Sequence, residues 1–206
     1  RNYWIWEEPQ DHKEYLLVAD VARGDGSDFS VAHVFDVQTM EQVAEYQGKV
    51  TPDMFASLLS TIGTEYNDAL LVIENNSLGI GVLSRLQESE YKNLYYSIKS
   101  THEYVDEVAA EALGGIAGFT MSMKTRPLVI AKFEEFVRNK LITVNSVRLA
   151  NEIKTFVWHN GRPQAMRSYN DDLVIAACIG CWVRDTALTA NKREKQYKKA
   201  LLSSIS

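Results

Sequence analysis

Residues 15–29 of this 206-residue chain read Y-L-L-V-A-D-V-A-R-G-D-G-S-D-F. The stretch opens on a continuous apolar run, 15–19, which stops at a carboxylate, Asp20. So short a run without polar alternation is typical of a strand covered on both faces, and therefore of an α/β sheet. Ligands of such sheets bind just beyond the carboxyl ends of the strands, where Asp20 would lie. Because a carboxylate there is costly unless a cation meets it, Asp20 is the first candidate site residue.

A second apolar run that ends on an acid follows later in the chain, after two more strands and a helix. Residues 30–36 and 41–50 read as two strands joined by a turn, and Thr51–Pro52 begins a helix that runs to about residue 66. A second buried run, 69–73, then stops on Glu74. The hairpin and helix between the two runs are long enough for the crossover of a parallel pairing. If the two strands are parallel neighbours, their ends lie only about 5 Å apart.

The second half of the chain is expected to add mostly helices. The expected elements are a helix after Ser77, a strand at 94–98, a helix at 124–139, a short strand at 142–144, a helix at 151–156, a hairpin at 158–166 and a buried helix at 173–183. Residues 99–123 hold acids and several glycines and read as a long loop, which in a compact domain is usually functional or disordered.

The domain organisation expected from the sequence is one α/β domain with two extensions. Residues 1–14 show no clear period and are predicted to be a linker, 15–190 form the domain, and 191–206 form a basic tail. Because the chain begins Arg-Asn-Tyr-Trp, without a methionine, we expect it to be a fragment of a larger protein.

Composition excludes some classes of protein and weakens another. With 46% hydrophobic and 24% charged residues the chain is ordinary for a globular protein, and no apolar run approaches the roughly 18 residues of a membrane span. A net charge of −5 argues mildly against a nucleic-acid partner, unless the acids are gathered in a site that binds divalent cations. Cys178 and Cys181 lie in an apolar, helix-like run and are expected to be core cysteines in a reducing compartment.

A third acidic point, Asp171–Asp172, precedes the late buried helix. Acids crowded together raise each other's pKa, so a cluster of Asp20, Glu74 and Asp172 is hard to sustain without bound cations. Oxygen-only ligands select hard ions such as Mg²⁺ or Mn²⁺. Two such ions roughly 4 Å apart would suit an in-line displacement at phosphorus.

Three segments carry a resemblance to a known family. They read L-L-V-A-D-V-A-R-G-D-G-S-D-F-S, then L-V-I-E-N-N-S-L-G-I-G-V, then Y-N-D-D-L-V-I-A. The order of these segments along the chain is similar to that in RNase H-like nucleases and Holliday-junction resolvases. Their amino-acid sequences resemble those of the nuclease domain of the large terminase subunit of tailed bacteriophages. The likeness runs from about residue 15 to residue 183. It implies an RNase H-like mixed sheet, a three-strand antiparallel unit plus parallel strands, flanked by helices.

The resemblance also implies a function and a set of site residues. The function is metal-dependent cleavage of concatemeric double-stranded DNA at the start and end of genome packaging. Asp20, Glu74 and Asp172 would be the metal-binding catalytic acids, while Asp171 would share a metal or hold the helix start. Asp28 matches an acid that relatives place eight residues after the first. Two positions depart from relatives: Asn170 stands where a His is frequent, and Arg23 where some carry an acid.

Further expectations surround these acids. Asn75 joins Asp28 as an outer residue of the site, and Lys124, Arg126 and Arg23 are candidates for DNA contact, with a surface ion pair as the competing role of Lys124 and Arg126. The chain has no G-x-x-x-x-G-K-[ST] loop, so it should cut DNA but not translocate it. By resemblance its partners are an ATPase domain, the portal and the small terminase subunit, in the host cell cytoplasm.

Two other functions remain open from the sequence. One is a catalytically silent module that only grips DNA or docks on the portal. The other is a phosphotransferase of the actin and sugar-kinase group, in which 113–115 would mimic a nucleotide loop; that fold needs two related halves, for which 206 residues are too few.

Overall fold

The computed structural model describes residues 1–24, 26, 28–98, 104–159 and 161–188. The strands are β1 (Tyr3–Ile5), β2 (Tyr15–Asp20), β3 (Ser30–Asp36), β4 (Gln42–Gly48), β5 (Leu70–Ile73), β6 (Tyr96–Ser97), β7 (Tyr104–Val105), β8 (Ile116–Ala117), β9 (Phe156–His159) and β10 (Arg162–Ala165). The α-helices are α1 (Pro52–Glu65), α2 (Ser77–Glu88), α3 (Glu107–Leu113), α4 (Thr125–Arg138), α5 (Val147–Thr155) and α6 (Asp172–Val183), and one π-helical turn, Arg184–Leu188, follows α6.

The central sheet has five strands in the order β1-β4-β3-β2-β5. Neighbours in β1-β4-β3-β2 run antiparallel, whereas β5 runs parallel to β2, with Ala19 opposite Ile73. This register brings Asp20 and Glu74 to the same edge of the sheet. The predicted mixed α/β sheet, an antiparallel unit extended by a parallel strand, is therefore confirmed.

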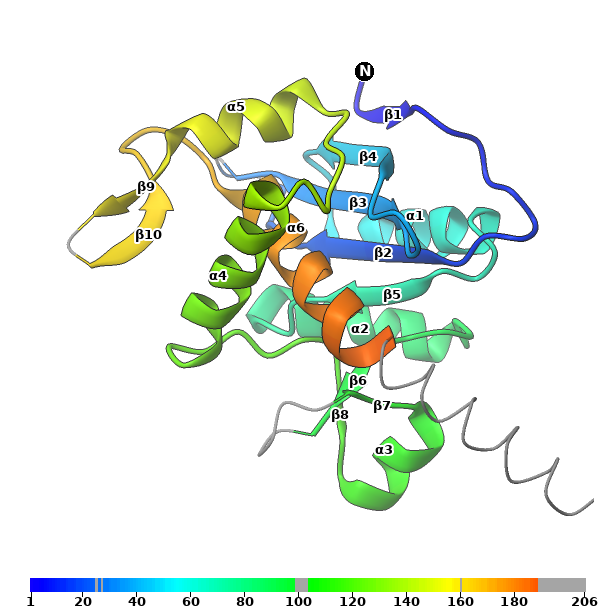
Figure 1. Cartoon of the computed structure of the whole chain (residues 1–206). Helices are drawn as coiled ribbons and strands as arrows, with labels where there is room; N and C mark the ends of the chain where they lie inside the picture. Colours follow the sequence, from blue (N-terminus) through cyan, green and yellow to red (C-terminus); the bar gives the residue numbers. More distant parts are fainter. Residues whose placement is uncertain (25, 27, 99–103, 160, 189–206) are drawn as a thin grey trace, which may run out of the picture.

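Helices cover both faces of the sheet (Figure 1). Successive side chains of a strand point to opposite faces, so β2 serves two cores. Leu16 and Val18 pack in the core that includes α4 and α6, while Leu17 and Ala19 pack in the core that includes α1 and α2. Every residue of 15–19 is buried, which explains why the run shows no polar alternation.

Helix α6 is apolar nearly all round because protein surrounds it. It packs against β2 and β3 with α4 beside it (Figure 1), and a methyl group at Gly180 would lie only 3.3 Å from Phe35 and Val18 side chains. Each large apolar side chain buried there stabilises the fold by roughly 1.5–3 kcal/mol. Cys178 and Cys181 are free thiols with no exposed surface, as the sequence predicts, and burial raises the pKa of both. This packing fixes where α6 begins, and with it the position of Asp171 and Asp172.

Three regions differ from the sequence-based expectation. Residues 3–5, placed in a linker, form β1 and add an edge strand to β4. The stretch 99–123 is not one long loop, since its described residues form β7, α3 and β8; β7 and β8 flank β6 in a small sheet, and 99–103 lie outside the described residues. The strand expected at 142–144 is reduced to a single bridge between Thr143 and Glu41.

Other expectations agree with the structure or lie beyond it. Strands β9 and β10 pair antiparallel as the hairpin expected at 158–166, and they project from the body of the domain (Figure 1); residue 160, expected at its turn, lies outside the described residues. The basic tail 191–206 lies outside the described residues. Across the described part of the chain, no helix combines the length and apolar character that crossing a membrane requires.

Candidate active site

Four acidic residues from three separate segments meet at the carboxyl edge of β2 and β5. Asp20 ends β2, Glu74 follows β5 directly, and Asp171 and Asp172 stand at the start of α6. Burial raises the pKa of Asp20 well above its ordinary value, and the charges of Glu74, Asp172 and Asp171 raise it further. The acids predicted from the sequence are thus close enough to act on one another electrostatically.

The two acids at the start of α6 have different partners. Asp172 Oδ2 accepts a hydrogen bond from the backbone N–H of Phe29, 3.2 Å away, and one from Asn170 Nδ2 at 3.5 Å. Burial is the main cause that raises the pKa of Asp172 to about 6. Asp171 instead forms an ion pair with Arg126, whose Nη2 lies 3.3 Å from Asp171 Oδ2. Asp172 is therefore the acid turned toward β3.

Glu74 is held by its backbone. The Glu74 N–H donates a hydrogen bond to the Ala19 carbonyl at 3.4 Å. On its other side, Glu74 forms an isolated parallel β-bridge with Phe119. Burial raises the pKa of Glu74, while the positive charge of Arg126 lowers it. Arg126, expected to contact phosphate or to form a surface ion pair, is thus a cation that stands among these acids and pairs with Asp171.

The remaining predicted residues lie around this group. Asp28 is exposed in the segment before β3, and its charge helps to raise the pKa of Asp172. Arg23 and Lys124 are exposed, three residues after Asp20 and at the start of α4 respectively. The Asn75 side chain donates to Ala117 O and Thr120 Oγ1, so it ties the residue after Glu74 to the segment before α4.

Sequence reasoning missed a fifth acid. Glu152 of α5 accepts hydrogen bonds from the N–H groups of Leu173 and Val174, the residues that follow Asp172. Burial raises the pKa of Glu152 to about 7, and the charges of Asp172 and Asp171 add to that rise. A signal existed: Glu152 lies three residues after the buried Leu149 and therefore on the inner face of its helix.

The donor set suits a hard divalent cation, although the side chains are engaged with protein groups. Within the described residues, no three Asp, Glu, His or Cys side chains form a ready-made metal-binding set. Asp20, Asp171 and Asp172 use backbone N–H groups or Arg126 as partners instead. Their oxygen-only chemistry, and the raised pKa of the three partly buried acids Asp20, Glu74 and Asp172, fit a site where a cation supplies the missing positive charge.

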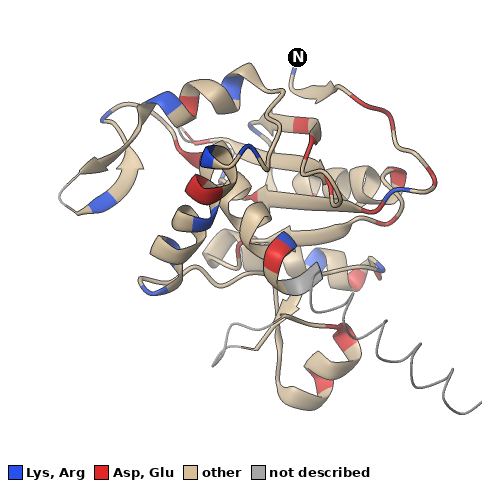
Figure 2. Ribbon diagram, in the orientation of Figure 1, with Lys and Arg blue, Asp and Glu red and all other residues tan. Residues whose placement is uncertain are grey.

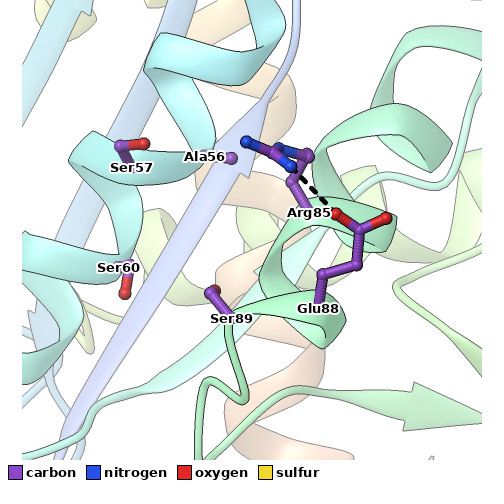
Figure 3. Close-up of a pocket in the computed structure, with 6 residues that line it drawn as sticks. All are labelled: Ala56, Ser57, Ser60, Arg85, Glu88 and Ser89. Carbon is purple, nitrogen blue, oxygen red and sulfur yellow. Dashed lines mark hydrogen bonds and ion pairs between the residues drawn. The ribbon is translucent and has the colours of Figure 1, made fainter.

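A separate pocket lies between α1 and α2 (Figure 3). Its volume is about 460 Å³, and it is lined by Ala56, Ser57, Ser60, Arg85, Glu88 and Ser89. Arg85 and Glu88 form an exposed ion pair at the side of this pocket. None of the clustered acids lines this pocket, so it plays no part in the site.

The raised pKa of Asp172 predicts how stability depends on pH. Its folded value is about 6 against an ordinary 3.8, so its contribution to stability is complete below pH 3.8 and is lost as pH rises through 6. Burial lowers the pKa of His33, so His33 changes the stability with pH in the opposite direction. The mutant and the wild type must therefore be compared at each pH, because the contribution of His33 then cancels. We expect the free energy of unfolding of Asp172→Asn, relative to wild type, to rise by about 1 kcal/mol from pH 5 to 8, after discounting for solvent screening.

Urea denaturation of the metal-free proteins at several pH values measures this difference, because His33 is common to both. Asn at position 172 keeps an oxygen for the Phe29 N–H, so the change tests charge rather than hydrogen bonding. A difference that stays constant with pH would contradict the electrostatic account of the site.

Comparisons with known proteins place the fold. No protein-family model matches the sequence, and no curated protein sequence matches it either. Solved structures do match. The large terminase nuclease from thermophilic phage G20c, with bound magnesium, has a TM-score of 0.67 at 15% sequence identity, over 88% of this chain and 87% of that chain. The human cytomegalovirus terminase nuclease domain, manganese-soaked and inhibitor-bound, has a TM-score of 0.50 at 10% identity, over 84% of each chain.

The strand order and the matching solved structures define an α/β domain with an RNase H-like fold. More particularly, the chain has the fold of the large terminase nuclease domains, which cover most of its length. At these identities the likeness establishes the fold alone. The structural resemblance expected from the three sequence segments is confirmed at that level.

Proposed function

We propose that this chain is a metal-dependent endonuclease that cuts concatemeric double-stranded DNA at the initiation and termination of viral genome packaging. The observation that carries the proposal is the meeting of Asp20, Glu74, Asp171 and Asp172 at the carboxyl edge of two parallel strands. The fold adds support, since its neighbours are terminase nucleases crystallised with magnesium or cobalt.

In this proposal Asp20, Glu74 and Asp172 are the catalytic metal ligands. Their carboxylates come from a strand end, the residue after a strand and a helix start, all anchored in buried elements, so the oxygens are pre-positioned. Asp171 shares a metal or stays with Arg126. Two bound Mg²⁺ or Mn²⁺ ions would activate a water and stabilise the leaving oxygen in an in-line displacement at phosphorus.

Basic residues at the rim of the site would hold the DNA backbone. Arg126 lies among the acids, and Lys124 stands two residues before it at the exposed start of α4. Arg23 is exposed on the loop that follows Asp20. Lys and Arg recur along α4, α5 and β10, with acids among them on α4 and α5, whereas acids dominate the β1–β2 segment and α3 (Figure 2). The net charge of −5 is therefore unevenly distributed, and DNA would approach from the α4 side.

The proposed partners follow from the same assignment. Double-stranded DNA is the substrate, and an ATPase domain, the portal and the small terminase subunit would restrain cutting during packaging. Asp28 and Asn75 are assigned to the surroundings of the acids: Asp28 through its charge on Asp172, and Asn75 through its tie to Thr120.

Incubation with supercoiled plasmid tests the proposal. We expect nicked and then linear DNA in millimolar Mg²⁺ or Mn²⁺, no product in EDTA, and activity that falls steeply with added salt because phosphate contacts release counterions. Calorimetry with Mn²⁺ alone should report binding. A chain that neither binds Mn²⁺ nor cuts DNA would instead be a silent docking module, and the endonuclease assignment would be wrong.

A further inference from the structure

The residue that follows Asp172 is held by side chains on both of its backbone polar groups. Leu173 N–H donates to Glu152 Oε2 at 2.9 Å, and the Leu173 carbonyl accepts from His33 Nε2 at 2.9 Å. Glu152 comes from α5 and His33 from β3, so two elements far apart in the sequence hydrogen-bond to the backbone of the same residue, Leu173. Leu173 and His33 have no exposed surface, so both contacts lie inside the protein.

The hydrogen bonds from Leu173 and Val174 to Glu152 replace a missing N-cap of α6. The first N–H groups of a helix lack partners within the helix and are usually satisfied by the side chain of the N-cap residue. Asp171 occupies the N-cap position of α6 but makes no such bond, because its carboxylate faces Arg126. Glu152 supplies the cap from another helix, bonding also to Val174 N–H at 3.2 Å. Both Asp171 and Asp172 are thereby released from capping.

The other hydrogen bond to Leu173, from His33, is anchored in a buried network. A carbonyl only accepts, so His33 Nε2 carries a hydrogen and its Nδ1 accepts from Gln42 Nε2 at 2.9 Å. Gln42 also donates to Glu45, and Arg148 Nε binds Glu45 at 2.7 Å. Because Arg148 and Glu152 both belong to α5, one helix fixes both ends of the arrangement.

We propose that Glu152, working with His33, is a positioning residue for Asp172: together they hold the Leu173 peptide and so set where the Asp172 carboxylate stands. This inference rests on the proposed nuclease function, in which Asp172 is a metal ligand. Loss of a group that orients a ligand typically lowers metal affinity or activity by about 10- to 100-fold.

Substitution of Glu152 separates positioning from simple support of the fold. Glu152→Ala removes the acceptor, whereas Glu152→Gln keeps an oxygen of similar reach and should retain a large part of the function. For Glu152→Ala we expect faster hydrogen exchange at the Leu173 and Val174 amides, Mn²⁺ binding weakened about 10- to 100-fold in calorimetry, and a lower kcat with little change in KM for plasmid DNA. Asn151→Ala, exposed on the same helix, is the matched control and should change none of these.

Two results would overturn the inference. One is unchanged exchange at Leu173 and Val174 in Glu152→Ala, whatever the activity. The other is a lower melting temperature with wild-type Mn²⁺ affinity and kcat per folded molecule, which would reduce Glu152 to a stabilising role. If the wild-type chain itself neither binds Mn²⁺ nor cuts DNA, the proposed function fails, and the exchange rates alone decide whether Glu152 holds the helix start.

Discussion

Asp20→Asn should abolish DNA cleavage while leaving a folded protein that is more stable than wild type without metal. Asp20 ends a strand whose preceding residues are buried; burial raises its pKa, and the charges of three other acids raise it further. Asn has nearly the same shape but no charge, so it relieves the repulsion and removes a ligand. Metal ions contribute several kcal/mol to transition states of this kind, which corresponds to a loss on the order of 10³-fold or more.

The measurement combines plasmid cleavage in Mn²⁺ with urea denaturation in EDTA. Asp11→Asn is the matched control, since Asp11 is an exposed acid in the segment before β2 and should alter neither quantity. Undiminished cutting by Asp20→Asn would remove Asp20 from the catalytic set and would leave the fold without an assigned chemistry.

The acids at strand ends were predictable because their signal is local. A run such as 69–73 is buried on both faces, so its end at Glu74 is visible as an abrupt change from apolar to charged residues. The intervening segment is long enough for a crossover and so allowed the parallel pairing of β2 with β5 that the structure shows. The start of α6 was nearly as plain, because the apolar run that follows Asp171 and Asp172 predicts a helix from residue 173, and the structure begins it one residue earlier, at Asp172.

What the sequence could not supply depends on docking between elements. Glu152 reaches α6 only because α5 lies across its start, and no sequence period reports that crossing. Residues 3–5 form a strand because the edge of β4 is open to pairing, although three residues carry no period of their own. Arg126 was an ambiguous surface cation until the fold set it beside Asp171. Each case is a contact between segments distant in the chain.

Gly79→Ala should damage both stability and activity, because the start of α2 passes close to the backbone of Glu74. A Cβ atom at position 79 would overlap the Glu74 carbonyl oxygen and lie 3.0 Å from its carbon. Backbone atoms cannot rotate away as a flexible side chain can, so either α2 or Glu74 must shift. Overpacking of this kind costs about 1–3 kcal/mol. A displacement of about 1 Å at Glu74 would lower the cleavage rate of the folded protein by roughly 100-fold.

Gly81 offers a matched control on the same helix. A Cβ atom there meets nothing within 4 Å, so Gly81→Ala should be neutral or stabilise the protein by about 0.5–1 kcal/mol through its better helix propensity. Urea denaturation of both variants, with cleavage rates expressed per folded molecule, separates the stability effect from the displacement of Glu74. Equal stability and equal rates for the two alanine variants would mean that α2 yields without moving Glu74, and the glycine at position 79 would then have no bearing on the site.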